Sequence, residues 1–300
     1  MFSKSTWLHL RIPFSFFLMP VYLFALSISP NFTEPRLIWT FVIIHLLLYP
    51  ASNGYNSYFD KDEKSIGGLA NPPPVERGLY VMSLLLDGVA VVLGFVKISL
   101  LFAIMLLIYG LVSKAYSHPG VRLKKYPITG WLTVACFQGF FAFMMCYVGV
   151  NGFGLENILK ERALLAATLC TLLLLGSYPM TQIYQHEEDA KHGDTTMSMM
   201  LGIRGTFYLA MIVFALTSLA FFWFFQFFYS SKYSYSFLLA LAPVIIFFLF
   251  WFIRFRKNES SANHYDLMWL NLLSALCLNG FFSYFFLDST QVIQAIQAGY

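Results

Sequence analysis

The sequence predicts an all-α, polytopic membrane protein in which nine transmembrane helices surround a central cavity. Of the 300 residues, 58% are hydrophobic and only 11% are charged, whereas about a quarter of the residues of a soluble domain are charged. The hydrophobic residues form stretches long enough to cross a bilayer as a helix, and two similar polar segments interrupt them. This composition excludes a soluble globular enzyme, a disordered chain and a secreted disulfide scaffold.

Nine apolar segments have close to the roughly 20 residues that a transmembrane helix needs. Their predicted bounds are 7–28, 37–57, 78–96, 98–113, 128–150, 164–184, 206–229, 236–253 and 267–287. The first contains Arg11 and two prolines and has no small-residue cleavage site, so we expect a span and not a signal peptide. The whole chain, 1–300, is expected to form one transmembrane domain. The four cysteines lack C-x-x-C spacing and are expected to be buried thiols.

Lysine and arginine residues predict the orientation, because cytoplasmic loops are enriched in them. With nine spans, the N-terminus and the loops after spans 2, 4, 6 and 8 share one side. That side carries 14 of the 19 Lys and Arg residues, and the other side carries 5. We therefore expect the N-terminus and these loops in the cytoplasm, with the protein in a bacterial inner membrane. The net charge of +4 gives no reason to expect nucleic acid, and no protein partner is predicted.

A repeated polar pattern marks the cytoplasmic ends of spans 2 and 6. Residues 49–60 and 178–189 both read Y-P-x-x-[NQ]-x-Y-[NQ]-x-x-x-D, at a constant offset of 129 residues. Residues at i, i+3 and i+7 share one face of a helix, so the pattern predicts two polar stripes. The first consists of Asn53, Asn56 and Asp60, and the second of Gln182, Gln185 and Asp189 with Glu188 at its edge.

The side chains of these stripes favour a magnesium ion. Amide and carboxylate oxygens suit a hard cation, and a small number of protein ligands suits Mg²⁺, which also takes water and substrate phosphates. Two prolines, Pro50 and Pro179, are expected to kink the helices and open a cavity. The alternative is that both segments are helix ends lying in water, but amides inside an apolar span are costly without a role. The expected metal ligands are Asn56, Asp60, Gln185, Glu188 and Asp189.

A basic segment after span 4 supplies cations on the same side of the membrane. Arg122, Lys124 and Lys125 lie close enough in sequence to neutralise a diphosphate, although an ordinary cytoplasmic loop would also be basic. Within span 3, Asp87 is either a functional acid or a structural residue paired with a cation.

On these residues the chain resembles the UbiA-type intramembrane prenyltransferase superfamily, over its whole length. The first motif of that family, N-x-x-N-D-x-x-D, is matched at Asn53, Asn56 and Asp60, with Ser57 in place of an Asp. In the second motif, D-x-x-x-D-x-x-x-G-x-x-T-x-x-x-x-L-G, Gln185 replaces the first Asp. The matched positions of the second motif are Asp189, Gly193, Thr196, Leu201 and Gly202. The chain is therefore similar to a divergent branch of the family.

The resemblance implies Mg²⁺-dependent transfer of an isoprenyl group from a polyprenyl diphosphate to a lipophilic acceptor, such as an aromatic or quinone-precursor compound, within the membrane. It gives the catalytic roles to Asp60, Asp189, Lys124 and Lys125. The residues expected to bind substrate are Asn53, Tyr55, Tyr58, Arg77, Arg122, Gln182, Tyr184 and His192. The alternatives are a terpene cyclase on the same fold, a catalytically impaired binding relative, and a transporter. The last is disfavoured because carriers place their sites near the midplane.

Overall fold

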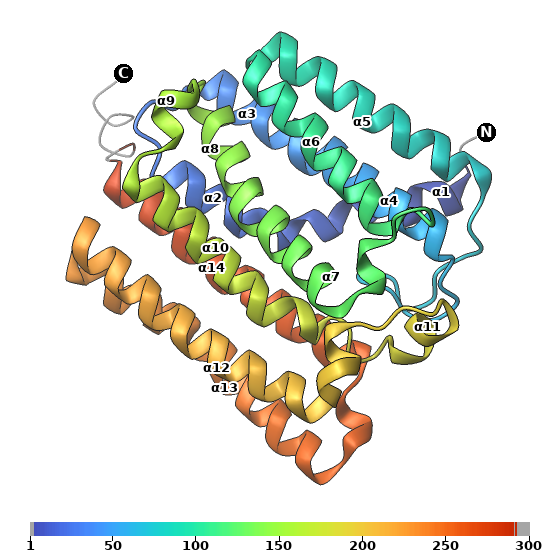
Figure 1. Cartoon of the computed structure of the whole chain (residues 1–300). Helices are drawn as coiled ribbons and strands as arrows, with labels where there is room; N and C mark the ends of the chain where they lie inside the picture. Colours follow the sequence, from blue (N-terminus) through green and yellow to red (C-terminus); the bar gives the residue numbers. More distant parts are fainter. Residues whose placement is uncertain (1–2, 291, 293–300) are drawn as a thin grey trace.

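The computed structural model describes residues 3–290 and 292, and it is an all-helical bundle without a β-strand in this part of the chain (Figure 1). Eight of its helices are long and apolar enough to cross a membrane. A bent pair at the N-terminus, 4–17 with 19–27, gives a ninth span if the pair is counted as one. The predicted all-α, multi-pass fold class is therefore confirmed.

The first five spans contain several short and irregular helices. Their elements are α1 (Lys4–His9), η1 (Ile12–Phe17), α2 (Met19–Ser27), α3 (Glu34–Phe41), η2 (Val42–Leu48), α4 (Tyr49–Asp60), α5 (Arg77–Lys97), α6 (Leu100–Ser117), η3 (Leu123–Lys125), α7 (Pro127–Val134), η4 (Ala135–Phe141) and α8 (Ala142–Asn151). In spans 2 and 5 the middle segments, η2 and η4, are π-helical, a wide turn often found at functional sites.

The remaining spans are long helices. Their elements are α9 (Leu155–Ile158), α10 (Glu161–Met180), α11 (His186–Lys191), α12 (Met197–Phe228), α13 (Ser231–Lys257), η5 (Glu259–Ser261) and α14 (His264–Ser289). The helix α10 packs against α12 and η4, and α14 packs against α13 and α2. Figure 1 shows α9 at one end of the bundle and α11 at the opposite end.

Aromatic side chains fill the half of the bundle in which α9 lies. Phe24 of α2 stacks on Phe282 of α14 with ring centroids 4.7 Å apart, and it meets the edge of Phe143 at 5.4 Å. Phe24, Phe143 and Phe282 are almost completely buried. Each such ring removes a large apolar area from its surroundings and packs best in offset or edge-on pairs.

The sixth span ends at Met180, before the predicted end at residue 184. The reason is Pro179, which has no N–H to donate to the carbonyl of Leu175 and cannot continue the helical ladder. The indole N–H of Trp131 donates to that carbonyl instead, at 2.9 Å. Residues 181–185 form turns, and α11 begins at His186.

This early end corrects the second polar stripe. Gln182 and Gln185 lie in the turns, and Asp189 lies on the separate helix α11, so they are not one face of a continuous helix. The first stripe has the predicted helical spacing, because Asn56 Nδ2 donates to Asp60 Oδ2 at 2.6 Å within α4. Sequence similarity between the two segments thus does not extend to their secondary structure.

Candidate active site

Both repeated segments line one cavity of about 300 Å³. The chain around the first segment contributes Asn53, Asn56 and Asp60, and Lys124 of η3 reaches the same cavity. The second segment contributes Gln182, Tyr184, Gln185 and Asp189. The structure therefore brings these eight candidate residues together, although they come from three loops or helix ends that are far apart in sequence.

A buried network of ion pairs joins the segments that follow spans 2, 4 and 6. Lys124 Nζ lies 2.7 Å from Asp60 Oδ2 and 3.4 Å from Asp194 Oδ2. Arg122 makes two hydrogen bonds to Asp194, of 2.7 and 2.8 Å, and lies 3.5 Å from Asp60 Oδ1. Both acids are 2% exposed. Burial alone would lower the pKa of Lys124, but the two carboxylates raise it above its usual value, so its ammonium stays charged.

Two other acids of the cavity are less completely paired. Burial raises the pKa of Asp189 to about 7; Lys124 opposes this rise, and nearby acids add to it. Burial, followed by the Asp60 carboxylate, raises the pKa of Asp62 to about 6. Asp60 Oδ1 and Asp189 Oδ2 are buried and make no hydrogen bond within the described chain. Buried carboxylate oxygens are stable when they meet a cation, so this cavity fits a divalent ion bound through oxygen.

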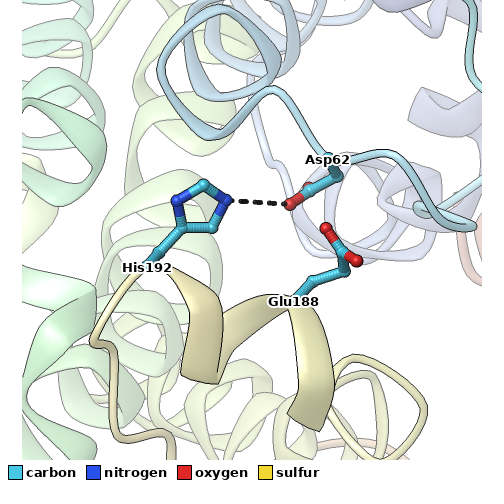
Figure 2. A group of neighbouring side chains, drawn as sticks. All are labelled: Asp62, Glu188 and His192. Carbon is cyan, nitrogen blue, oxygen red and sulfur yellow. Dashed lines mark ion pairs between the residues drawn. The ribbon is translucent and has the colours of Figure 1, made fainter.

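A second group of possible metal ligands lies between the loop after α4 and the helix α11 (Figure 2). One ligand atom each from Asp62, Glu188 and His192 lies within 4.8 Å of the others. His192 Nε2 is 3.9 Å from Asp62 Oδ1, and Glu188 already accepts hydrogen bonds from Lys191 Nζ and from the backbone N–H of Glu63. Glu188 and His192 are thus close together, but neither lines the cavity that holds Asp60 and Asp189.

Three predicted substrate-binding residues of the first segment and its loop lie elsewhere. Tyr55 and Tyr58 pack on Tyr80 of α5, with ring centroids 5.9 and 5.1 Å away, and Arg77 is an exposed residue at the start of α5. None of the three lines the cavity, so the structure does not bring them to the other candidate residues, and their role in substrate binding stays a prediction. On a helix successive residues turn by about 100°, and the two tyrosines consequently face α5 while Asn56 faces the cavity.

Of the three basic residues predicted after span 4, only Lys124 lines the cavity. Lys125 is exposed, and its backbone carbonyl accepts the N–H of Thr195 at 3.2 Å. Arg122 is held by Asp194 outside the lining of the cavity. Within span 3, Asp87 forms an ion pair with Lys114 of α6, the pairing expected if it is a structural acid. Two of the cysteines, Cys146 and Cys170, are buried as predicted, whereas Cys136 is exposed.

Sequence reasoning did not identify several residues that line the cavity. Arg11 lies at a break between α1 and η1, with φ of 47°, and donates to the carbonyls of Gly67 (3.2 Å) and Asn53 (3.4 Å). Its position inside an apolar span was the available signal, because such a cation is costly in a membrane without a role. The hydroxyls of Tyr116 and Tyr178 hydrogen-bond to each other at the cavity wall, a contact between distant helices.

A second, apolar chamber of about 440 Å³ adjoins this cavity. It lies among α2, α10, α12, α13 and α14, and the described residues that line it include no ionisable side chain. The residues that line both spaces are Phe17, Leu18, Leu174, Ser177 and Asn271. A molecule with a charged head and an apolar tail fits such a pair of spaces.

Comparison with known proteins identifies one protein family. The sequence profile described as the UbiA prenyltransferase family matches residues 17–273, while no curated protein sequence matches the chain.

Solved structures share the fold. A UbiA homolog from Archaeoglobus fulgidus bound to GPP and Mg²⁺ has a TM-score of 0.65 and 16% identity, over 94% of this chain and 99% of the homolog. An apo UbiA homolog from Aeropyrum pernix K1 has a TM-score of 0.69 and 17% identity, over 90% and 96%. A digeranylgeranylglyceryl phosphate synthase has a TM-score of 0.59 and 18% identity, over 94% and 98%.

Proposed function

We propose, from the premise that this chain belongs to the UbiA prenyltransferase family, that it transfers an isoprenyl group from a polyprenyl diphosphate to a lipophilic acceptor. The chain is an integral, multi-pass membrane protein. One observation carries the proposal: a cavity lined by acids, amides and Lys124 adjoins an apolar chamber. A diphosphate that carries a hydrocarbon chain needs both environments, and it needs them in contact.

The polar cavity would hold the diphosphate. Lys124 and Arg11 line it, and both can donate hydrogen bonds to phosphate oxygens. Asp60 and Asp189, with Asn56 and Gln185, would hold Mg²⁺, the ion that the A. fulgidus homolog binds together with GPP. Bound there, Mg²⁺ supplies positive charge to the departing diphosphate. Asp189 Oδ2, a buried carboxylate oxygen without a hydrogen bond or ion pair within the described chain, supports this assignment.

The reaction begins with loss of the diphosphate from the allylic carbon C1. The C1–oxygen bond breaks with its electron pair left on the diphosphate, a bond forms between C1 and the acceptor, and the proton lost by the acceptor leaves with the diphosphate. Rings of Tyr116, Tyr178 and Tyr184 line the cavity and can stabilise an allylic cation by about 0.5–2 kcal/mol for each contact. The apolar chamber would hold the prenyl chain, away from water.

We place the active site at the cytoplasmic face of a bacterial inner membrane. The distribution of Lys and Arg residues supports this orientation, because 14 of the 19 fall on the side of the loops that carry the site.

The proposal is tested with full-length protein in lipid nanodiscs. The protein is incubated with radiolabelled geranylgeranyl diphosphate, Mg²⁺ and fractionated lipid extracts. We expect a radiolabelled lipid adduct that disappears in excess EDTA, and a rate at least ~100-fold lower for Asp60→Ala and Asp189→Ala, the scale of losing a principal electrostatic contact. Asp288→Ala is the control, because Asp288 pairs with Lys232 at the end of α14 and lies outside the cavity. Cyclic hydrocarbon products, or full turnover in EDTA, would contradict the proposal.

A further inference from the structure

The carboxylate of Asp60 is already held by other side chains. Asp60 Oδ2 accepts a hydrogen bond from Asn56 Nδ2 at 2.6 Å and lies 2.7 Å from Lys124 Nζ. Asp60 Oδ1 lies 3.5 Å from a guanidinium nitrogen of Arg122. The side chains of Asp60 and Lys124 are at least nine-tenths buried, and like charges repel strongly where water is excluded. A divalent ion that approaches either oxygen of Asp60 therefore meets a cation that competes for it.

The buried cluster around Asp60 is balanced in charge. Its two carboxylates belong to Asp60 and Asp194, and its two cations are Lys124 and Arg122. Such a cluster is stable while every charge has a partner, and an additional charge would be buried without compensation. A divalent ion alone would make the cluster positive, whereas an ion accompanied by a diphosphate would not. Asp189 differs, because its Oδ2 has no hydrogen bond or ion pair within the described chain.

Lys124 can leave Asp60 without leaving the cluster. Its Nζ also lies 3.4 Å from Asp194 Oδ2, so a second carboxylate remains beside it. The adjoining backbone is tied to the segment before α12, because the carbonyl of Lys125 accepts the N–H of Thr195 at 3.2 Å. The four-carbon stem of a lysine is flexible, and Lys124 lines the polar cavity. Its ammonium can consequently turn from Asp60 to an anion in the cavity while Asp194 stays its partner.

We propose that Lys124 is an exchangeable counter-ion of Asp60, which pairs with this carboxylate until a diphosphate enters and then pairs with phosphate oxygens, leaving Asp60 to a divalent ion. Asp194 is the permanent partner that keeps the ammonium at the cavity. The anion and the divalent ion consequently bind with positive coupling, and each raises the affinity for the other by the same factor. The identification of the anion as a diphosphate rests on the proposed function, whereas the competition for Asp60 does not.

The inference is tested by the affinity of full-length protein in detergent for Mn²⁺ alone, measured by electron paramagnetic resonance in chloride. Lys124→Met should bind Mn²⁺ at least about tenfold more tightly than wild type, because it leaves a buried carboxylate that an ion can compensate. Lys124→Arg keeps the charge and should bind as weakly as wild type. Lys232→Met is the matched control, since Lys232 pairs with Asp288 outside the cavity, and it should change nothing. The gain should vanish when Lys124→Met is combined with Asp60→Asn.

A second measurement uses wild type and does not depend on the folding of a variant. Sulfate replaces chloride at equal ionic strength and equal free Mn²⁺, and it offers Lys124 an anionic partner. We expect sulfate to tighten Mn²⁺ binding to wild type several-fold and to leave Lys124→Met unchanged. Mn²⁺ binding to wild type that does not respond to sulfate, or an equal response in both proteins, would overturn the inference. So would a folded Lys124→Met that binds Mn²⁺ no more tightly than wild type.

The outcomes separate this inference from the proposed function. A protein that shows the predicted gain in Lys124→Met and the predicted response to sulfate, yet transfers no prenyl group, would overturn the proposed function alone. Prenyl transfer by wild type, with the same Mn²⁺ affinity in wild type and Lys124→Met, would overturn the exchange alone.

Discussion

Glu187 and Glu188 are neighbours on α11 with opposite environments. Glu188 is 3% exposed and lies in the group formed with Asp62 and His192, whereas Glu187 is exposed and pairs with Lys64. If Glu188 contributes to a metal site, Glu188→Gln should lower the affinity for Mn²⁺ several-fold. The exposed pair of Glu187 contributes little, so Glu187→Gln should leave the affinity unchanged. Manganese titration followed by electron paramagnetic resonance measures both, and equal small effects would exclude Glu188 as a ligand.

Asp189 is expected to make stability depend on pH. Burial raises its pKa from 3.8 to about 7, so between these values the folded protein binds more protons than the unfolded chain. The free energy of unfolding therefore falls as the pH rises from about 4 to about 7. Asn has no proton to lose, so Asp189→Asn should unfold at a higher temperature than wild type at pH 8, and by a clearly smaller margin at pH 5. Thermal unfolding of metal-free protein in detergent checks this, and an equal difference at both pH values would contradict it.

At the scale of elements, the loops and helix ends that form the site depend on residues that interrupt helices. Pro179 ends α10, Arg11 separates α1 from η1 in a left-handed conformation, and Gly202 breaks α12 near its start. Each interruption leaves backbone groups without the hydrogen bonds that a continuous helix would have made. The Trp131 indole satisfies one such carbonyl, that of Leu175, and thereby ties span 5 to span 6.

Gly202 offers the clearest test of such an interruption. Its φ of 67° and ψ of 164° lie in a region essentially restricted to glycine, and a Cβ there would meet no heavy atom within 4 Å. Gly202→Ala should therefore destabilise the protein by about 1–3 kcal/mol through backbone strain alone. Gly280→Ala is the control, because Gly280 is helical and its Cβ would also meet nothing within 4 Å. Chemical denaturation in mixed micelles measures both; equal effects would show that the strain is relieved.

At the scale of the whole molecule, the bundle separates two kinds of interior. The half near α9 is filled by packed phenylalanine rings, and the half near α11 holds the polar cavity. The apolar chamber adjoins both, because Phe237 and Leu241 of the packed core also line it. Because the polar cavity lies near α11 at one end of the bundle, the proposed function requires that the orientation of the bundle decides from which side of the membrane a charged substrate enters.

This orientation predicts a labelling pattern. Lys257 is the last residue of α13, Lys160 directly precedes α10, and both side chains are exposed. Each is replaced by cysteine, Lys257→Cys or Lys160→Cys, in a background in which the four native cysteines are replaced by alanine. The positive-inside distribution predicts that an impermeant maleimide labels position 257 only from the cytoplasmic side and position 160 only from the other side. Inside-out and right-side-out vesicles distinguish the two. The reverse pattern would show that the charge asymmetry does not set the topology of this chain.

The sequence by itself determined the all-α membrane class, the approximate positions of the spans and the segments that carry the site. These properties follow from composition and short-range spacing, because bilayer length and helix periodicity act on consecutive residues. The stripe of Asn56 and Asp60 was predictable for the same reason, and the end of the sixth span was signalled by Pro179. The tertiary structure alone decided which charges meet.

Lys124 forms a buried ion pair with Asp60, and the hydroxyls of Tyr116 and Tyr178 form a hydrogen bond. Gln138 lines the cavity while its neighbour Gly139 packs on α10. Each of these contacts joins helices or loops whose relative positions depend on the packing of the whole bundle, which no local pattern encodes.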